Sequence, residues 1–202
     1  MKIGILGGTF NPVHVGHLVL AQDALEDYEL DKILFVPCAT PAHKEESSLA
    51  PTRHRVAMLE LALEHDPRFE VSMVELERGG VSYTIDTVEA LAVAHPKAEL
   101  FFIIGGDTLF EIHSWRQVDR LLSLCEFIVM ARPGFEDRDL TAQTLRLDDP
   151  WAERLAGRVT AMHLVDVSSS DIRMRVAEGL SIRYLVPPEV AMYISEHNLY
   201  NR

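Results

Sequence analysis

Cysteine is scarce in this sequence, and its scarcity excludes two kinds of stabilised site. Among 202 residues there are only two cysteines, Cys38 and Cys125, and each stands next to an apolar run. Neither belongs to a spacing typical of zinc ligands or of a disulfide framework. We therefore expect no structural disulfide and no zinc site, and we interpret both residues as thiols of the core.

Positive charge is also in short supply. The chain has 19 Lys and Arg against 31 Asp and Glu, a net charge of -12. A surface that binds nucleic acid or an anionic membrane needs many clustered cations, so we expect neither partner. An anionic ligand would need a local cationic pocket, and this directs attention to Lys, Arg and His beside glycine turns and helix starts.

Long apolar runs are absent. The longest, such as Leu100 to Ile104, are far too short to span a bilayer, and Met1 to Leu6 reaches glycines before an apolar signal region forms. We expect an untargeted, cytoplasmic protein. The sequence also has no internal repeat and no low-complexity segment, so its length predicts one domain over residues 1–202. It does not indicate an oligomeric state.

Strand-like and helix-like segments alternate along the chain. Short apolar runs predict strands at Ile3 to Leu6, Lys32 to Val36, Phe69 to Val74, Leu100 to Ile104, Phe127 to Met130 and Val159 to Val165. Helical spacing predicts helices at Leu18 to Tyr28, Arg53 to Glu64, Ile85 to Ala94 and Arg116 to Leu124, and two more near the C-terminal end. This order favours an α/β fold, a Rossmann-like doubly wound parallel sheet with helices on both faces and ligands at the carboxyl ends of its strands.

Two later segments invite structural rather than chemical interpretations. The polar, Asp-rich stretch from about Gly134 to Pro150 is typical of an irregular surface insertion. The segment from Pro187 to Tyr200 has Pro near its start and apolar residues at helical spacing. It predicts a helix that covers the sheet.

The turn after the first strand, GGTFNPVHVGH from Gly7 to His17, concentrates glycine and histidine. Gly7 and Gly8 are able to adopt positive φ and expose backbone N–H groups, while a helix is expected to begin near Gly16. His14 and His17 are three apart, which places both imidazoles on one side of the first turn, near the positive end of the helix dipole. The spacing fits neither the dinucleotide nor the Walker motif. It predicts a phosphate site; the alternative is a glycine turn with two structurally satisfied histidines.

These eleven residues resemble the signature of the nucleotidyltransferase superfamily, whose H-x-G-H motif binds nucleoside triphosphate phosphates. Five further segments extend a likeness to the bacterial nicotinate-nucleotide adenylyltransferase family over nearly the whole length. They are TPAHK from Thr40, RHRVAMLELAL from Arg53, SYTIDTVEAL from Ser82, GGDTLFEIHSW from Gly105, and ARPG followed by VSSSDIR at Val167 to Arg173. The resemblance implies transfer of AMP from ATP to nicotinate mononucleotide, giving deamido-NAD and pyrophosphate.

On the ATP side the resemblance implies a set of catalytic residues and a set of ATP-binding residues. The catalytic set is His14, His17, Lys44 and Arg173, and the ATP-binding set is Gly7, Gly8, Thr9, Phe10, Gly105, Asp107, Ser169 and Ser170. Ser169, Ser170 and Arg173 would offer hydroxyls and a guanidinium at a helix start, unless the serines are ordinary caps. Lys44 on its loop reaches phosphate or is simply solvated, and Asp107 accepts from ribose hydroxyls or caps a helix.

On the mononucleotide side the implied residues are Lys44, Ser82, Tyr83, Thr84, Trp115 and Arg132. Trp115 would stack on the pyridine ring or belong to the core, and the helix start at Thr84 offers a seat for a carboxylate. Arg132 follows a strand and is either directed to the site or solvated. His43, His54, His113 and Arg53 are secondary candidates. The chain departs mildly from the family at Asn11, Ala42 and Ser170, where relatives often carry Asp, Pro and Thr.

The implied reaction needs no protein nucleophile and no general base, because the attacking phosphate is already anionic. His17 would act on the α-phosphate, with His14 and Arg173 on the β- and γ-phosphates. Mg²⁺ is expected to bridge the triphosphate, held mainly by substrate oxygens and water. Two alternatives remain open: another member of the superfamily such as pantetheine-phosphate adenylyltransferase, and a nucleotide-sensing module without turnover.

Overall fold

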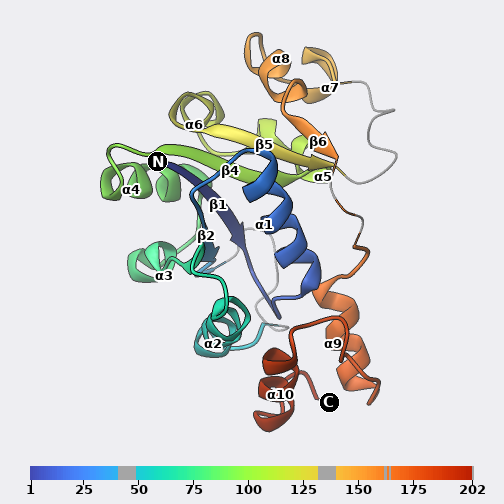
Figure 1. The fold of residues 1–202 in the computed structure, drawn as a ribbon. Coiled ribbons are helices and arrows are strands. Elements are labelled where there is room, and N and C mark those ends of the chain that lie inside the picture. Colours follow the sequence, from blue (N-terminus) through green and yellow to red (C-terminus); the bar gives the residue numbers. More distant parts are fainter. Residues whose placement is uncertain (41–48, 132–139, 162, 164, 202) are drawn as a thin grey trace.

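The fold is built on a six-stranded parallel sheet, seen in a computed structural model that describes residues 1–40, 49–131, 140–161, 163 and 165–201. The strands are β1 (Lys2–Gly8), β2 (Lys32–Pro37), β3 (Phe69–Val71), β4 (Glu99–Gly105), β5 (Glu126–Ala131) and β6 (Val159–Ala161), as shown in Figure 1. Their order across the sheet is β3-β2-β1-β4-β5-β6. This is the doubly wound, Rossmann-like arrangement that the alternating sequence pattern predicts.

The direction in which the sheet grows reverses at β1. Ile3 of β1 pairs with Lys32 of β2 on one side and with Leu100 of β4 on the other. From β1 the chain builds β2 and β3 outward, then returns to add β4 at the opposite edge of β1. In open α/β sheets a ligand crevice lies at such a switch point, beyond the carboxyl ends of the two strands. Here β1 ends at Gly8 and β4 ends at Gly105.

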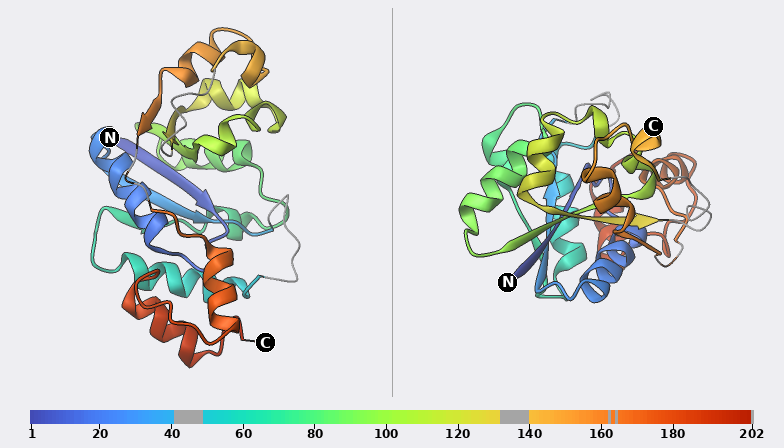
Figure 2. Two further views of the ribbon diagram at one scale, coloured as in Figure 1. Left: turned by 90° about the vertical axis from the view of Figure 1, so that its right-hand side faces the viewer. Right: turned by 90° about the horizontal axis from the view of Figure 1, so that it is seen from above.

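Helices cover both faces of the sheet (Figure 2). One face, with Phe102 and Ile104, packs against α4 (Thr84–Ala94) and α6 (Val118–Leu124). The other, with Phe101 and Ile103, packs against α1 (Val15–Asp27) and α2 (Thr52–Leu63), and residues of α9 (Ser169–Ala177) and α10 (Pro188–Glu196) belong to the same core cluster. Successive strand residues point to opposite faces, so the apolar run of β4 supplies both cores.

Short helices connect the main elements. They are α3 (Val74–Arg78), α5 (Gly106–Leu109), the 3₁₀ helix η2 (Ile112–Ser114), α7 (Ala142–Leu145) and α8 (Trp151–Ala156). The expected irregular insertion is partly wrong: its residues 134–139 lie outside the described chain, but α7 falls inside it and both Leu145 and Leu147 are buried. The polar, Asp-rich composition of the segment gave no indication that these two leucines belong to the core.

Three other predicted boundaries or placements are wrong. β3 ends at Val71 because α3 begins at Val74, and β6 ends at Ala161. The last helix, α10, packs mainly against α2 rather than on the sheet. Figure 1 shows α10 and α2 together at the bottom of the view, on the side where α9 also lies.

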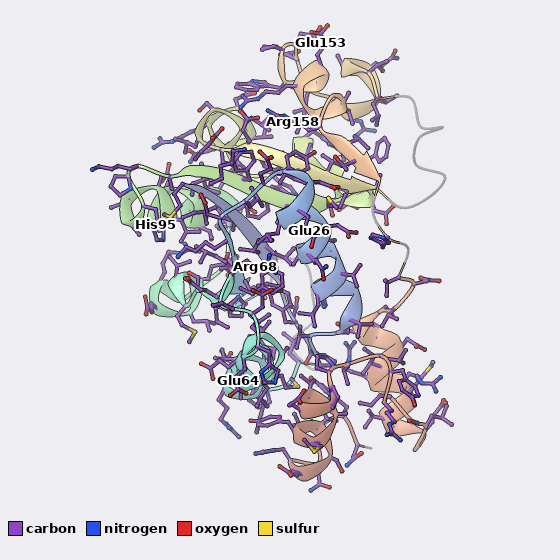
Figure 3. All side chains as sticks on the ribbon, in the orientation of Figure 1. Glu26, Glu64, Arg68, His95, Glu153 and Arg158 are labelled. Carbon is purple, nitrogen blue, oxygen red and sulfur yellow. The ribbon has the colours of Figure 1, made fainter. Side chains whose placement is uncertain are left out.

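Most of the described carboxylate side chains are exposed, although Asp23 and Glu75 are buried. Figure 3 labels Glu26 on α1, Glu64 at the end of α2 and Glu153 on α8, and all three side chains are exposed. Such carboxylates are solvated and leave the local charge of a site free to differ from the net charge. No helix in the described ranges is long and apolar enough to cross a membrane.

The two cysteines are free thiols in different surroundings. Cys125 is buried, and burial raises the pKa of its thiol to about 12, so its interpretation as a core thiol is confirmed. Cys38 is only half-buried, and its Sγ lies 4.0 Å from Nη1 of Arg55. The core interpretation of Cys38 is therefore only partly right.

Candidate active site

The loop from Thr9 to Pro12 connects β1 to α1, and side chains from distant helices bind its backbone carbonyls. Arg55 Nη1 of α2 donates to the Thr9 carbonyl at 2.8 Å. From α9, Arg173 Nη1 donates to the Asn11 carbonyl and Ser169 Oγ to the Pro12 carbonyl, both at 2.9 Å. These donors offset the partial negative charge of three carbonyl oxygens. The loop is thereby fixed in place and made compatible with a neighbouring anion.

The two glycines directly before this loop do not adopt the conformation that the sequence predicts. Positive φ at Gly7 and Gly8 is wrong: both belong to β1, and the left-handed residue is Phe10, with φ of 47°. Gly8 is needed for space, since a Cβ there would lie 3.0 Å from Cζ of Phe10. The Phe10 ring is 2% exposed and meets the His17 ring edge to face. Its side chain is part of the core, so a ligand contact predicted for Phe10 would fall to its backbone.

His14 and His17 lie together at the start of α1, as predicted. His14 is the N-cap residue, and its backbone N–H donates to Nδ1 of His17 at 3.2 Å. The two ring centroids are 3.7 Å apart. A nitrogen that accepts a hydrogen bond carries no proton, so neutral His17 holds its proton on Nε2 and can donate it to an anion. Gly16 completes the motif, because a Cβ there would lie 3.0 Å from Nδ1 of His14.

The start of α9 lies beside this loop (Figure 1), and its three serines have separate tasks. Ser168 is the N-cap and accepts from the Asp171 N–H, so the ordinary-cap interpretation holds for Ser168 alone. The hydroxyl of Ser169 donates to the Pro12 carbonyl, and Ser170 accepts from Nη2 of Arg173 at 3.2 Å. The predicted Ser169, Ser170 and Arg173 are therefore brought to the β1–α1 loop.

The start of α4 is held next to the end of β2. The Ser82 N–H donates to the Thr40 carbonyl at 3.2 Å, and the Ala39 N–H donates to Ser82 Oγ at 3.1 Å. Thr84 is the first residue of α4, and the side chain of its N-cap residue, Tyr83, makes no capping hydrogen bond. The first-turn N–H groups of a helix have no acceptor within the helix, so this end suits a carboxylate.

Trp115 and Arg116 connect α4 with the strand ends. The Trp115 ring meets Phe102 edge to face at 5.9 Å, and Phe102 Cζ lies 3.4 Å from where a Cβ of Gly7 would be. Trp115 is half-buried, so it packs on the core near the end of β1. Arg116 lies over the Tyr83 ring at 4.8 Å. Sequence reasoning missed Arg116, whose only signal is its position directly after Trp115.

Arg55 is the second residue that sequence reasoning missed. It is 1% exposed, and besides the Thr9 carbonyl its guanidinium binds the Cys38 carbonyl at 2.9 Å and Thr52 Oγ1 at 3.1 Å. It thus connects the loops that follow β1 and β2. The signal was present in the sequence, because this arginine falls on the apolar stripe of α2, whose buried residues are Arg55, Met58, Leu59 and Leu63.

The remaining candidates divide by location. Gly105 ends β4 and is the N-cap of α5, while Asp107 is exposed in the first turn of that helix and is not its cap residue. Lys44 and Arg132 lie outside the described residues, as does His43. Across the parts of the chain that are described, no group of three or more His, Cys, Asp or Glu gathers as a metal site would require.

Two secondary histidines are engaged elsewhere. His54 Nδ1 lies 2.9 Å from the Tyr193 hydroxyl, between α2 and α10, and loss of hydration together with the nearby Arg53 lowers the pKa of His54. His113 Nδ1 lies 3.0 Å from the Phe110 carbonyl. Neither contact reaches the β1–α1 loop.

Comparison with known proteins agrees with this geometry. A family model described as cytidylyltransferase-like matches residues 5–175. Two relatives bear the name probable nicotinate-nucleotide adenylyltransferase: that of Symbiobacterium thermophilum is 44% identical over 100% of this chain and 96% of its own, and that of Opitutus terrae is 45% identical over 99% and 98%.

The solved structure of Plasmodium falciparum nicotinic acid mononucleotide adenylyltransferase complexed with APC has a TM-score of 0.73 at 21% identity, covering 98% of this chain and 96% of that one. At that identity the likeness concerns the fold. Full-length identity above 40% to the two bacterial relatives, together with the family-model match and the paired histidines at the start of α1, places the chain in a nucleotidyltransferase family: it belongs to the nicotinate-nucleotide adenylyltransferases.

Proposed function

We propose that this protein transfers AMP from ATP to nicotinate mononucleotide, forming deamido-NAD and releasing pyrophosphate, a step of NAD biosynthesis. The observation that carries the proposal is the β1–α1 loop, whose carbonyls are occupied by Arg55, Ser169 and Arg173 beside the His14–His17 pair. Family membership supports the same reaction. The substrates are small molecules, in keeping with a site made from loops and helix starts.

The mechanism needs the 5′-phosphate of the mononucleotide to attack the α-phosphorus of ATP in line. The protein then has to position two anions and stabilise charge on the leaving pyrophosphate. His17 donates from Nε2 to an α-phosphate oxygen, where charge grows in the transition state. Arg173 donates one N–H to the Asn11 carbonyl and one to Ser170 Oγ, and its remaining N–H groups are proposed to bind the β- and γ-phosphates together with His14. Lys44 is proposed to neutralise the phosphates as well.

The residues of this site fit a Mg²⁺ ion that binds together with ATP. The described donors at the loop are N–H and O–H groups, which bind phosphate oxygens rather than a cation, and carboxylates do not gather there in the described residues. We therefore propose that phosphate oxygens and water hold the ion. When bound, it neutralises charge on the triphosphate and its leaving group.

The first test compares nicotinate mononucleotide with its amide analogue. The N–H groups at the start of α4 favour a carboxylate, whereas a carboxamide NH₂ would face donors and leave a buried group unpaired, at about 1–3 kcal/mol. We expect kcat/KM to be about ten- to a hundredfold higher for the acid. Pyrophosphate release on the purified protein measures both. No turnover of either substrate would refute the function, and equal efficiencies would refute the role of α4.

Thr84 offers a matched pair of variants for that role. It is the first residue of α4, and Tyr83 before it is extended, so proline is tolerated here while removing one N–H. Thr84→Ala removes only the hydroxyl. We expect Thr84→Pro to reduce the preference for the acid more than Thr84→Ala does. The same preference in both variants would contradict an N–H contact at this residue.

Trp115→Ala tests the ring-binding side. Loss of stacking on the pyridine ring should raise KM for the mononucleotide by about fivefold, on the order of 1 kcal/mol, with little change for ATP. Trp151→Ala is the control, because Trp151 also packs on the core but lies on α8. If Trp115→Ala raised both KM values equally, Trp115 would be a structural residue only.

A further inference from the structure

Tyr200, which follows α10, reaches back to the β1–α1 loop. Its hydroxyl donates to Oδ1 of Asn11 at 2.9 Å, across 189 residues of sequence. The Ala50 N–H donates to the same oxygen at 3.0 Å, and Asn11 is 2% exposed. The backbone carbonyl of Asn11 accepts a hydrogen bond from Nη1 of Arg173. One buried residue therefore connects the C-terminal segment with a guanidinium assigned to the triphosphate.

The backbone at both ends of this contact adopts an uncommon conformation. Tyr200 has φ of 64°, and Phe10, directly before Asn11, has φ of 47°. For bulky residues the left-handed region costs about 1–2 kcal/mol each, and it persists only where surrounding contacts enforce it. The left-handed turn at Tyr200 follows the buried Leu199, which packs with the core of α2 and α10. These contacts hold the phenol of Tyr200 against Asn11.

We propose that Tyr200 is a positioning residue for ATP, acting through Asn11 to hold the β1–α1 loop and Arg173 in the geometry that receives the triphosphate. The inference rests on the function proposed above and extends it to a residue outside every segment that carries the family likeness. Tyr200 itself touches no substrate in this scheme. Its contribution is to reduce the number of conformations that Asn11 and the attached guanidinium can adopt before ATP binds.

The electrostatic surroundings agree with a donating hydroxyl. Burial raises the pKa of Tyr200, and the nearby Arg173 and Arg55 only partly oppose this effect. The hydroxyl therefore stays protonated throughout the neutral range. Asn11 Oδ1 has no proton to give, so the direction of the hydrogen bond is fixed from Tyr200 to Asn11.

Tyr200→Phe is the test, because it removes the hydroxyl and keeps the ring. We expect KM for ATP to rise about five- to tenfold while KM for the mononucleotide stays within about twofold. Tyr193→Phe is the matched control: it lies on α10 and also loses one hydroxyl contact, to His54, but has no bond to the loop. Unchanged KM for ATP in Tyr200→Phe, or an equal rise for both substrates, would overturn the proposal.

A double-mutant cycle separates positioning from general support. If Tyr200 acts through Asn11, Tyr200→Phe should weaken ATP binding in the normal chain and have almost no further effect in Asn11→Ala. Additive effects would show that Tyr200 acts by another route. Calorimetric titration with a non-hydrolysable ATP analogue provides the same comparison without turnover. It would still report on Tyr200 if the activity assay failed and refuted the proposed function.

Discussion

Replacing His17 with alanine should lower kcat by about 100-fold or more while changing ATP binding much less. The reason is the direction of its hydrogen bond: Nδ1 accepts from the His14 N–H, so the proton of neutral His17 is on Nε2, the nitrogen that we propose donates to the α-phosphate. Charge on the α-phosphate oxygens grows only as the reaction proceeds, and a fixed donor there stabilises the transition state more than bound ATP. Steady-state kinetics with saturating mononucleotide, beside ATP-analogue titration, measures the two effects separately.

His17 also has a structural task, and two variants separate it from catalysis. Asparagine can place its Oδ1 near the position of Nδ1 and keep the bond from the His14 N–H, but it has no donor at the position of Nε2. Glutamine can place its amide nitrogen near Nε2. We expect the Tm of His17→Asn to be close to that of the unmodified protein, while its kcat falls as far as that of His17→Ala. We expect His17→Gln to recover part of the rate. Near-normal kcat in folded His17→Ala would remove His17 from the chemistry.

Much of the fold could be predicted because strands and helices are indicated by residues that lie close together in the sequence. The apolar run from Leu100 to Ile104 lies within β4, and alternation of strands with helices correctly implied a parallel sheet with both faces covered. The helix starts predicted near Gly16 and at Ser169 also rest on local signals, since each is marked by residues within one turn, and α1 and α9 begin at Val15 and Ser169. Local patterns failed at Leu145 and Leu147, where core residues stand in a polar stretch.

The parts of the site that sequence reasoning missed depend on long-range pairing. Arg55 meets Thr9 across 46 residues, and Tyr200 meets Asn11 across 189. No motif encodes such a contact, because each partner looks ordinary in its own segment. The error at Gly7 and Gly8 is local: both residues belong to β1, and the left-handed residue is Phe10, two residues after Gly8.

The other large effect is expected at Arg55, whose side chain is the principal connection between the loops after β1 and β2 that the structure describes. Arg55→Met preserves much of the side-chain volume but removes the donors to the Thr9 carbonyl, the Cys38 carbonyl and Thr52 Oγ1. Each buried acceptor left unpaired costs about 1–3 kcal/mol. Part is regained because a guanidinium that is 1% exposed no longer has to be desolvated.

We therefore expect the free energy of unfolding to fall by about 3 kcal/mol in Arg55→Met, measured by urea denaturation. kcat should fall too, since the Thr9 carbonyl is released at the loop that carries the histidine pair. Arg53→Met is the matched control: Arg53 is exposed on the same helix, and its removal should change stability by no more than about 0.5 kcal/mol. Arg55→Lys keeps the charge but cannot bridge three acceptors, so it should fall between the two. Stability of Arg55→Met equal to that of Arg53→Met would show that the β1–α1 loop holds its shape without this arginine.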